Sequence, residues 1–345
     1  MPKKFTHPKL SETLTTADKQ LADDFLAEQL NYNTKKTVDG KRGHIRAFGA
    51  WLRSRDTGDG RTNLTDVTPR VFKNFIRDAI NDGYSSTAVH HRYYSLKTFY
   101  DWMKNEGIEG VDQDGAITDR VTRGQREYLR GNSEKQKSAP FGFYLESDEV
   151  ESMLENSPHP RVRNQLIMKL MYHCGLRRGE VARIKLEYVD FSESSITVEN
   201  LKAGTNQEPY RKVWFKREVG SLLRAWIHGG GRDSAYRADT SPYLFATNQA
   251  DHISETTIND NVKLAADRAG IQETIYVDKQ DYERKKITAH TLRHSYAVHC
   301  VKNGMDIKTL SDLMGHSDIS ITQKYLRFKD EARKKKALNF GPGTD

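Results

Sequence analysis

Four short stretches in the second half of the chain combine residue types that could bind a phosphate group and react with it. They are CGLRRGE at residues 174–180, NLKAG at 200–204, HTLRH at 290–294 and LMGHSDISITQKY at 313–325. Arginine stays charged, and its planar guanidinium group matches two phosphate oxygens at once. Histidine titrates near neutral pH and can accept a proton, and tyrosine can act as a nucleophile. Arg177 and Arg293 are therefore candidate phosphate ligands, and Tyr325 is a candidate nucleophile.

The HTLRH stretch has two interpretations. His290 and Arg293 are three residues apart, so on a helix they share one face and place a titratable base beside a phosphate ligand. A zinc site is the alternative, because His290 and His294 are one helical turn apart and His299 follows. The intervening residues lack the glutamate of the metalloprotease pattern, and no third ligand is evident. We therefore expect no metal, and we interpret His294 and His299 as structural.

Taken together, the stretches resemble the tyrosine recombinase family, which includes phage integrases and Xer-like proteins. That family has an arginine in a Gly-Leu-Arg turn, an acid three residues later, and a lysine in a β-hairpin. A His-x-x-Arg pair, a Gly-His pair and a tyrosine nine residues after that histidine follow. This chain matches these positions, in order, at Arg177, Glu180, Lys202, His290, Arg293, His316 and Tyr325. The resemblance spans roughly residues 145–330, and the joint order is its most specific feature.

The resemblance implies a reaction on a DNA phosphodiester. Tyr325 would attack the phosphorus and form a 3′-phosphotyrosine with a free 5′-hydroxyl. His290 would accept the proton of the tyrosine, and Lys202 would protonate the leaving 5′ oxygen. The bond energy would be stored in the phosphotyrosine, so neither ATP, a cofactor nor a metal is expected. In agreement, the sequence contains no P-loop pattern and no Gly-x-Gly-x-x-Gly fingerprint.

The same resemblance assigns supporting roles. Arg177 and Arg293 would hold the non-bridging oxygens, where negative charge builds up in the transition state. His316 would form a hydrogen bond with a phosphate oxygen, and Glu180 would orient a neighbouring basic side chain rather than react.

The loop around Lys202 departs from the commonest family pattern, which is a compact Gly-Lys-Gly followed by further basic residues. Here Lys202 is followed by Ala-Gly-Thr-Asn-Gln-Glu-Pro, and Arg211 and Lys212 come later. Lys212 is therefore the alternative candidate for the role of the lysine.

Helices must position these residues. In the first third of the chain, apolar residues recur at helical spacing in four segments. The third begins at Thr68-Pro69, and Ser86 is the predicted cap of the fourth. Lysines, arginines and histidines lie between these apolar stripes, which predicts a small four-helix domain with a basic face at residues 1–115. This region resembles the core-binding (SAM-like) domain of the family. Residues 116–143 are dense in charge and predict a basic linker.

From residue 144 to residue 330, helical patterns surround one hairpin signal. The segments Ser195–Glu199 and Tyr210–Phe215 alternate β-branched or aromatic residues with polar ones around a loop. Gly270, Gly304 and Gly315 are predicted helix ends. The fold class is therefore mainly α with a small β-hairpin (α+β), and the resemblance implies two domains that form a C-shaped clamp on DNA. Residues 331–345 are a predicted tail, and the segment Lys329–Asn339 would contact a neighbouring subunit.

Bulk properties fit this interpretation. The 345 residues carry a formal charge of +8, which favours a polyanionic partner. No apolar run approaches the roughly 20 residues that span a bilayer. Cys174 and Cys300 are expected to be free thiols, as in a reducing compartment. We therefore expect a soluble cytoplasmic, nucleoid-associated protein.

Several functions remain open at this point. The resemblance implies a homotetramer on double-stranded DNA sites, with an accessory directionality factor as a further partner. We favour an integrase that integrates and excises a mobile element, and an Xer-like dimer-resolution recombinase is the alternative. A type IB topoisomerase is a further alternative, which the Gly-His…Tyr tail and the helical N-terminal region disfavour. A non-catalytic DNA-binding protein is another, which the intact set of reactive residues disfavours.

Overall fold

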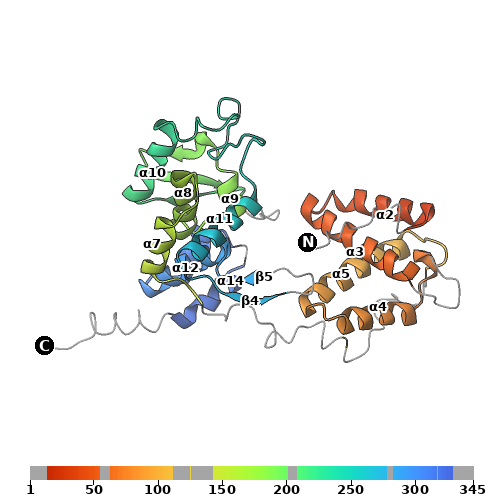
Figure 1. The fold of residues 1–345 in the computed structure, drawn as a ribbon. Coiled ribbons are helices and arrows are strands. Elements are labelled where there is room, and N and C mark those ends of the chain that lie inside the picture. Colours follow the sequence, from red (N-terminus) through yellow and green to blue (C-terminus); the bar gives the residue numbers. More distant parts are fainter. Residues whose placement is uncertain are drawn as a thin grey trace. The chain divides into compact units, whose positions relative to one another are not determined.

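The computed structural model describes residues 14–54, 63–111, 125, 143–200, 208–277, 283–316 and 318–328. Lys202, the tail from 331 to 345 and nearly all of the predicted linker lie outside these residues. The chain divides into two compact units, residues 1–136 and 137–345 (Figure 1). No helix in the described part of the chain is long and apolar enough to cross a membrane.

The first unit contains the four predicted helices. They are α2 (Thr16–Gln29), α3 (Lys35–Ser54), α4 (Pro69–Asn81) and α5 (Ser86–Asn105), with a short 3-10 turn η1 (Leu64–Asp66). The Thr68 side chain accepts the backbone N–H of Val71, so α4 begins as predicted. The cap of α5 is Ser85 rather than Ser86, because the Ser85 hydroxyl accepts the N–H of Ala88.

An aromatic core holds these helices together. Phe25, Phe48, Phe72 and Phe99 are fully buried. The ring centroids of Phe48 and Phe75 lie 4.9 Å apart in an edge-to-face arrangement, which is a favoured geometry for aromatic pairs. The apolar stripes that predict the helices therefore face one another in this core.

The second unit consists of helices around two small sheets. Its helices are α7 (Ser147–Glu155), α8 (Arg161–His173), α9 (Arg178–Ala182), α10 (Arg217–His228), α11 (Glu255–Arg268), α12 (Ala289–Lys302), α13 (Ile307–Met314) and α14 (Ser320–Gln323). Its 3-10 turns are η3 (Leu186–Tyr188) and η4 (Lys324–Phe328). Its strands are β1 (Val189–Asp190), β2 (Ser195–Glu199), β3 (Tyr210–Trp214), β4 (Thr274–Val277) and β5 (Glu283–Lys285).

The predicted hairpin is β2–β3, an antiparallel pair that aligns Ile196 with Val213. β1 adds a third strand to it, and β4–β5 forms a separate two-stranded sheet. The sequence patterns predict neither of these additions. Gly270, Gly304 and Gly315 have positive φ values of 71°, 93° and 60° just beyond helices, so the predicted helix ends are confirmed.

Helix α12 lies at the centre of the second unit, where it packs against α8, α11 and α13. Its residues Leu292, Ala297 and Val298 are completely buried. Because α12 also carries His290 and Arg293, two of the predicted reactive side chains extend from one of the most enclosed helices of the unit.

Candidate active site

Three arginines converge on the carboxylate of Glu180, whose side chain has no exposed surface. The Nη1 of Arg177 lies 2.7 Å from one carboxylate oxygen, and Arg211 binds both oxygens at 2.9 and 3.2 Å. Nη1 of Arg293 lies 3.6 Å from the same group. The carboxylate also accepts the backbone N–H of Arg177 at 2.7 Å, because the spacing of three residues places it over the start of α9. The expectation that Glu180 orients basic side chains agrees with this geometry.

The carboxylate of Glu180 is ionised in this environment. Burial opposes ionisation, but the hydrogen bonds and charge of Arg211, together with the charges of Arg293 and Arg177, outweigh it and lower the pKa of Glu180. One negative charge therefore faces three positive charges. The net positive charge that remains suits an anion.

The same arginines close the end of α13. The last carbonyl groups of a helix have no partner within the helix, so they need external donors. Arg211 donates to the carbonyl of Leu313 at 2.9 Å, and Arg177 donates to that of Gly315 at 3.0 Å. The carbonyl of Met314 accepts from Arg293 at 2.7 Å and from Arg177 at 3.2 Å.

Glycine is required in the Gly-Leu-Arg turn. Gly175 has a φ of 66°, and a Cβ atom there would lie 2.4 Å from the ring of Tyr296. This close approach directs the carbonyl of Gly175 to Nη1 of Arg293, which donates to it at 2.6 Å. The motif therefore links α8, α9 and α12 at the point where the two predicted phosphate ligands meet.

His316 lies directly beside Arg293. Nη2 of Arg293 donates to Nε2 of His316 at 3.0 Å, and Nδ1 of His316 lies 2.7 Å from the hydroxyl of Thr322. Because arginine can only donate, Nε2 must be unprotonated and Nδ1 carries the proton. Burial, followed by the charge of Arg293, lowers the pKa of His316 to about 3. His316 is therefore neutral at physiological pH.

The residue His290 keeps an exposed surface near the start of α12, although protein atoms surround much of its imidazole ring. The imidazole ring of His290 is partly desolvated by these atoms, and this desolvation, followed by the charges of Arg293 and Lys324, lowers its pKa to about 4. Within the described residues it forms no hydrogen bond, so its ring is available to a substrate. Its predicted role as the proton acceptor stays a prediction.

Tyr325 is only 2% exposed, within the apolar cluster of Val298, Leu310 and Met314. Burial raises the pKa of Tyr325 to about 12, although the charge of Arg293 acts in the opposite direction. The phenol is therefore protonated in this arrangement. Attack on a phosphate would require the hydroxyl to move toward the substrate and lose its proton.

The partner of the Tyr325 hydroxyl is His294, not His290. A hydrogen bond of 3.1 Å joins the phenol to Nδ1 of His294, and the two rings lie 5.1 Å apart. Burial, followed by the charge of Lys324, lowers the pKa of His294 to about 4, so this histidine is neutral. His299 is bound to the backbone carbonyl of Leu145 at 2.9 Å, which agrees with a structural role.

Sequence reasoning missed two contributions. The sequence marks Arg211 only as a basic residue after the loop, yet it is the bidentate partner of Glu180. The sequence predicts a structural role for His294, yet this residue contacts the candidate nucleophile. The only available signal for His294 was its position one residue after Arg293, and for Arg211 its position on the strand that follows Lys202.

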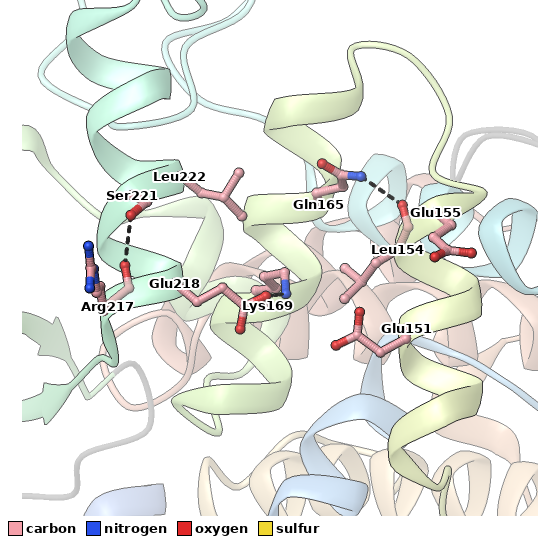
Figure 2. A pocket seen from close by; sticks show the side chains of 9 residues that line it. All are labelled: Glu151, Leu154, Glu155, Gln165, Lys169, Arg217, Glu218, Ser221 and Leu222. Carbon is pink, nitrogen blue, oxygen red and sulfur yellow. Dashed lines mark hydrogen bonds and ion pairs between the residues drawn. The ribbon is translucent and has the colours of Figure 1, made fainter.

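A separate open pocket of about 610 Å³ lies between α7, α8 and α10 (Figure 2). Glu151, Glu155 and Glu218 contribute negative charge to its lining, and Lys169 is paired with Glu218. It shares no lining residue with the arginine cluster. The candidate active site around Glu180 is therefore separate from this pocket.

Comparison with known proteins gives a consistent picture. A model described as the phage integrase family matches residues 144–332. Tyrosine recombinase XerA of Pyrococcus furiosus is 28% identical over 75% of this chain and 83% of that protein. XerA of Thermococcus kodakarensis is 29% identical over 88% of this chain and 92% of that protein. XerD of Ralstonia nicotianae is 26% identical over 84% of this chain and 83% of that protein.

Solved structures share the fold. The XerH site-specific recombinase in a pre-cleavage complex with its difH substrate gives a TM-score of 0.64 at 17% identity, covering 94% of this chain and 85% of that chain. The Tn1549 transposon integrase in complex with transposon right end DNA gives 0.62 at 17% identity, covering 92% and 99%. The predicted mainly helical α+β fold is therefore confirmed.

Proposed function

Because the chain belongs to the phage integrase family, we propose that it is a site-specific recombinase that cleaves and rejoins DNA through a 3′-phosphotyrosine at Tyr325. The family membership confirms the resemblance to tyrosine recombinases. The observation that carries the proposed mechanism is the convergence of Arg177, Arg293 and His316 on one cluster. Thr322, on the segment that bears Tyr325, is hydrogen-bonded to His316 and ties the nucleophile to that cluster.

In the proposed reaction, a DNA phosphate occupies the positive end of the cluster. Arg177 is 28% exposed and retains donors that can reach a ligand. Arg293 and His316 would exchange their mutual hydrogen bond for phosphate oxygens, and the incoming negative charge would favour a proton on Nε2 of His316. Donors fixed in advance stabilise the charge of the transition state without reorganisation, which is the largest contribution in many enzymes.

The tyrosine step requires movement and proton transfer. Tyr325 would leave His294, approach the phosphorus, and lose its proton to His290, whose ring is neutral and forms no hydrogen bond among the described residues. The oxygen of Tyr325 forms the new bond to phosphorus, and the bond to the 5′ oxygen breaks. Lys202 would donate the proton to that oxygen, with Lys212 as the alternative donor. Reversal of these steps with another 5′-hydroxyl rejoins the DNA.

We also propose that the first unit binds the same DNA as the second unit, which would give the C-shaped clamp. Its exposed or half-exposed cations supply a phosphate-binding face; among them are Arg42, Arg46, Arg70, Lys73 and Arg92. We further propose a homotetramer on two DNA sites, in which the segment after Tyr325 contacts a neighbouring subunit, and an accessory directionality factor.

For the biological role, we propose integration and excision of a mobile element. The Xer-like alternative, resolution of chromosome or plasmid dimers, is supported by relatives named XerA and XerD that align over three quarters or more of this chain. The position of the target site discriminates between the two roles. A site at the end of an element indicates an integrase, and a single site on a host chromosome indicates dimer resolution.

Covalent trapping tests the proposed function. The protein is mixed with nicked DNA fragments from its own genome and denatured, and the attached DNA is sequenced. We expect an adduct on Tyr325 confined to one short site, and no adduct with Tyr325→Phe, which should bind DNA nearly as well. Adducts scattered over many sequences would indicate a topoisomerase instead. Binding without any adduct would indicate a non-catalytic protein.

A further inference from the structure

Arg211 on β3 directs its guanidinium group entirely at protein partners. Nε donates to Leu313, Nη1 donates to Glu180 and to Oδ1 of Asn200 at 2.6 Å, and Nη2 donates to Glu180. Four of the five N–H groups of an arginine are thereby used. Its side chain is only 8% exposed, against 28% for Arg177. Arg211 is therefore not placed to bind a phosphate itself.

These bonds join three elements that are distant in the sequence. Glu180 lies on α9, Leu313 at the end of α13, and Asn200 directly after β2. Asn200 in turn closes the base of the hairpin, because its backbone N–H donates to Pro209 at 2.7 Å and its side-chain amide to Glu208 at 2.6 Å. The base of the hairpin and the turn before His316 are thus held by one guanidinium group.

The turn at Gly315 is built around the same group. Gly315 adopts the left-handed conformation, with a φ of 60°. A Cβ atom on it would lie 2.8 Å from Nη1 of Arg211 and 2.9 Å from Oδ1 of Asn200. The glycine of the Gly-His pair is therefore required both for its backbone conformation and for the close approach of Arg211.

We propose that Arg211 is a positioning residue of the active site, which sets where the side chains of Arg177 and His316 lie by fixing Glu180 and the Leu313–Gly315 turn. This role rests on the proposed function of the site. The planar fork of arginine binds both oxygens of Glu180 while Nε reaches Leu313, and the single ammonium group of lysine cannot reproduce that geometry. Shape, and not charge alone, is what Arg211 supplies.

The test compares Arg211→Lys with Arg232→Lys. Arg232 is the matched control because its side chain is also largely enclosed and donates only to backbone carbonyls, those of Ala238, Ser241 and Tyr243, away from the cluster. The probe is a nicked DNA duplex that carries the site recovered by covalent trapping. DNA affinity and the single-turnover rate of adduct formation are measured for the folded fraction of each variant.

We expect Arg211→Lys to slow adduct formation about tenfold or more while DNA affinity stays within about twofold, because a small displacement of catalytic donors costs rate rather than binding. Arg232→Lys should lose stability but keep the wild-type rate. A wild-type rate for Arg211→Lys would overturn the positioning role. So would equal losses of rate in the two variants, since that would indicate a general loss of packing.

A second measurement does not depend on DNA. Ring nitrogen chemical shifts of His316 in the free protein should show the Nδ1-protonated form in the wild type and in Arg232→Lys, and a mixture of forms in Arg211→Lys. An unchanged His316 spectrum in Arg211→Lys contradicts the proposal. If the wild-type protein itself forms no adduct, the proposed function fails, and the His316 spectra still decide whether Arg211 positions the turn.

Discussion

The two units of this protein differ in what they bury. Among the described residues, the first unit encloses one charged side chain, Asp18, beside an aromatic core. The second unit encloses Lys169, Glu180, Arg232 and Arg293. Buried charges are costly unless they are paired, and replacing them by apolar groups often stabilises a protein. Stability alone therefore does not account for the charges around Glu180, whereas the proposed binding of a DNA phosphate would account for them.

The largest difference between the units should appear in catalysis. Arg177→Ala should slow adduct formation about 100- to 1000-fold, because it removes charge stabilisation from the transition state. The matched variant in the first unit is Arg46→Ala, which should weaken DNA binding and leave the rate at saturating protein unchanged. Single-turnover cleavage of the trapped site measures both. Unchanged turnover in Arg177→Ala would show that the motif assignment is wrong.

The second difference concerns the two buried carboxyl groups. Glu180→Gln should cost about 3 kcal/mol in the free energy of unfolding of the second unit, because it leaves buried arginines without their counter-charge. In the first unit, Oδ1 of Asp18 accepts the N–H of Leu64 and Oδ2 has no partner among the described residues. An amide keeps that acceptor, so Asp18→Asn should change stability by less than about 1 kcal/mol. Hydrogen exchange resolved by mass spectrometry measures the stability of each unit separately. Equal changes in stability for Glu180→Gln and Asp18→Asn would show that the two buried carboxyl groups do not differ in this way.

The third difference is a dependence on pH. In the second unit, burial lowers the pKa values of four histidines: His173, His290 and His294 to about 4, and His316 to about 3. In the first unit, it lowers that of His44 to about 4. An unfolded histidine takes up its proton near pH 6.5, so stability falls as the pH decreases from about 6.5 toward 4. After allowance for solvent screening, each half-buried histidine should contribute roughly 1 kcal/mol. Hydrogen exchange at pH 7 and at pH 5 measures the free energy of unfolding of each unit. We expect the second unit to lose more stability than the first between these pH values, and equal losses in the two units would contradict this prediction.

The smallest effect concerns two buried tyrosines. Tyr100 in the first unit donates to the carbonyl of Leu64 at 2.9 Å, and Tyr325 is bound to His294. His294→Phe removes a bond of about 1 kcal/mol, so nitration of Tyr325 by tetranitromethane should rise about fivefold. Tyr100 is the internal control and should not change. Mass spectrometry of the tryptic peptides measures both, and an unchanged Tyr325 would show that its burial does not depend on His294.

Much of this protein was determined by local sequence. Thr68-Pro69 starts a helix because a side-chain oxygen and a fixed φ act within one turn. The alternation in β2 and β3 predicts their pairing because the two segments follow each other in the sequence, separated only by residues 200–209. The candidate reactive residues are also readable, because arginine can bind phosphate, histidine can accept a proton and tyrosine can act as a nucleophile whatever the surrounding fold.

Only the tertiary structure decided which of these groups meet. Arg211 lies 31 residues from Glu180 and 102 from Leu313, a separation that no helical or strand period spans. His294 reaches Tyr325 because α12 and η4 pack together, so the choice between His290 and His294 as partner of the resting phenol depends on that packing. The burial of Tyr325 follows from the same contact. Local rules extend over a few residues, whereas the electrostatics of this site arise from elements that become neighbours only when the chain has folded.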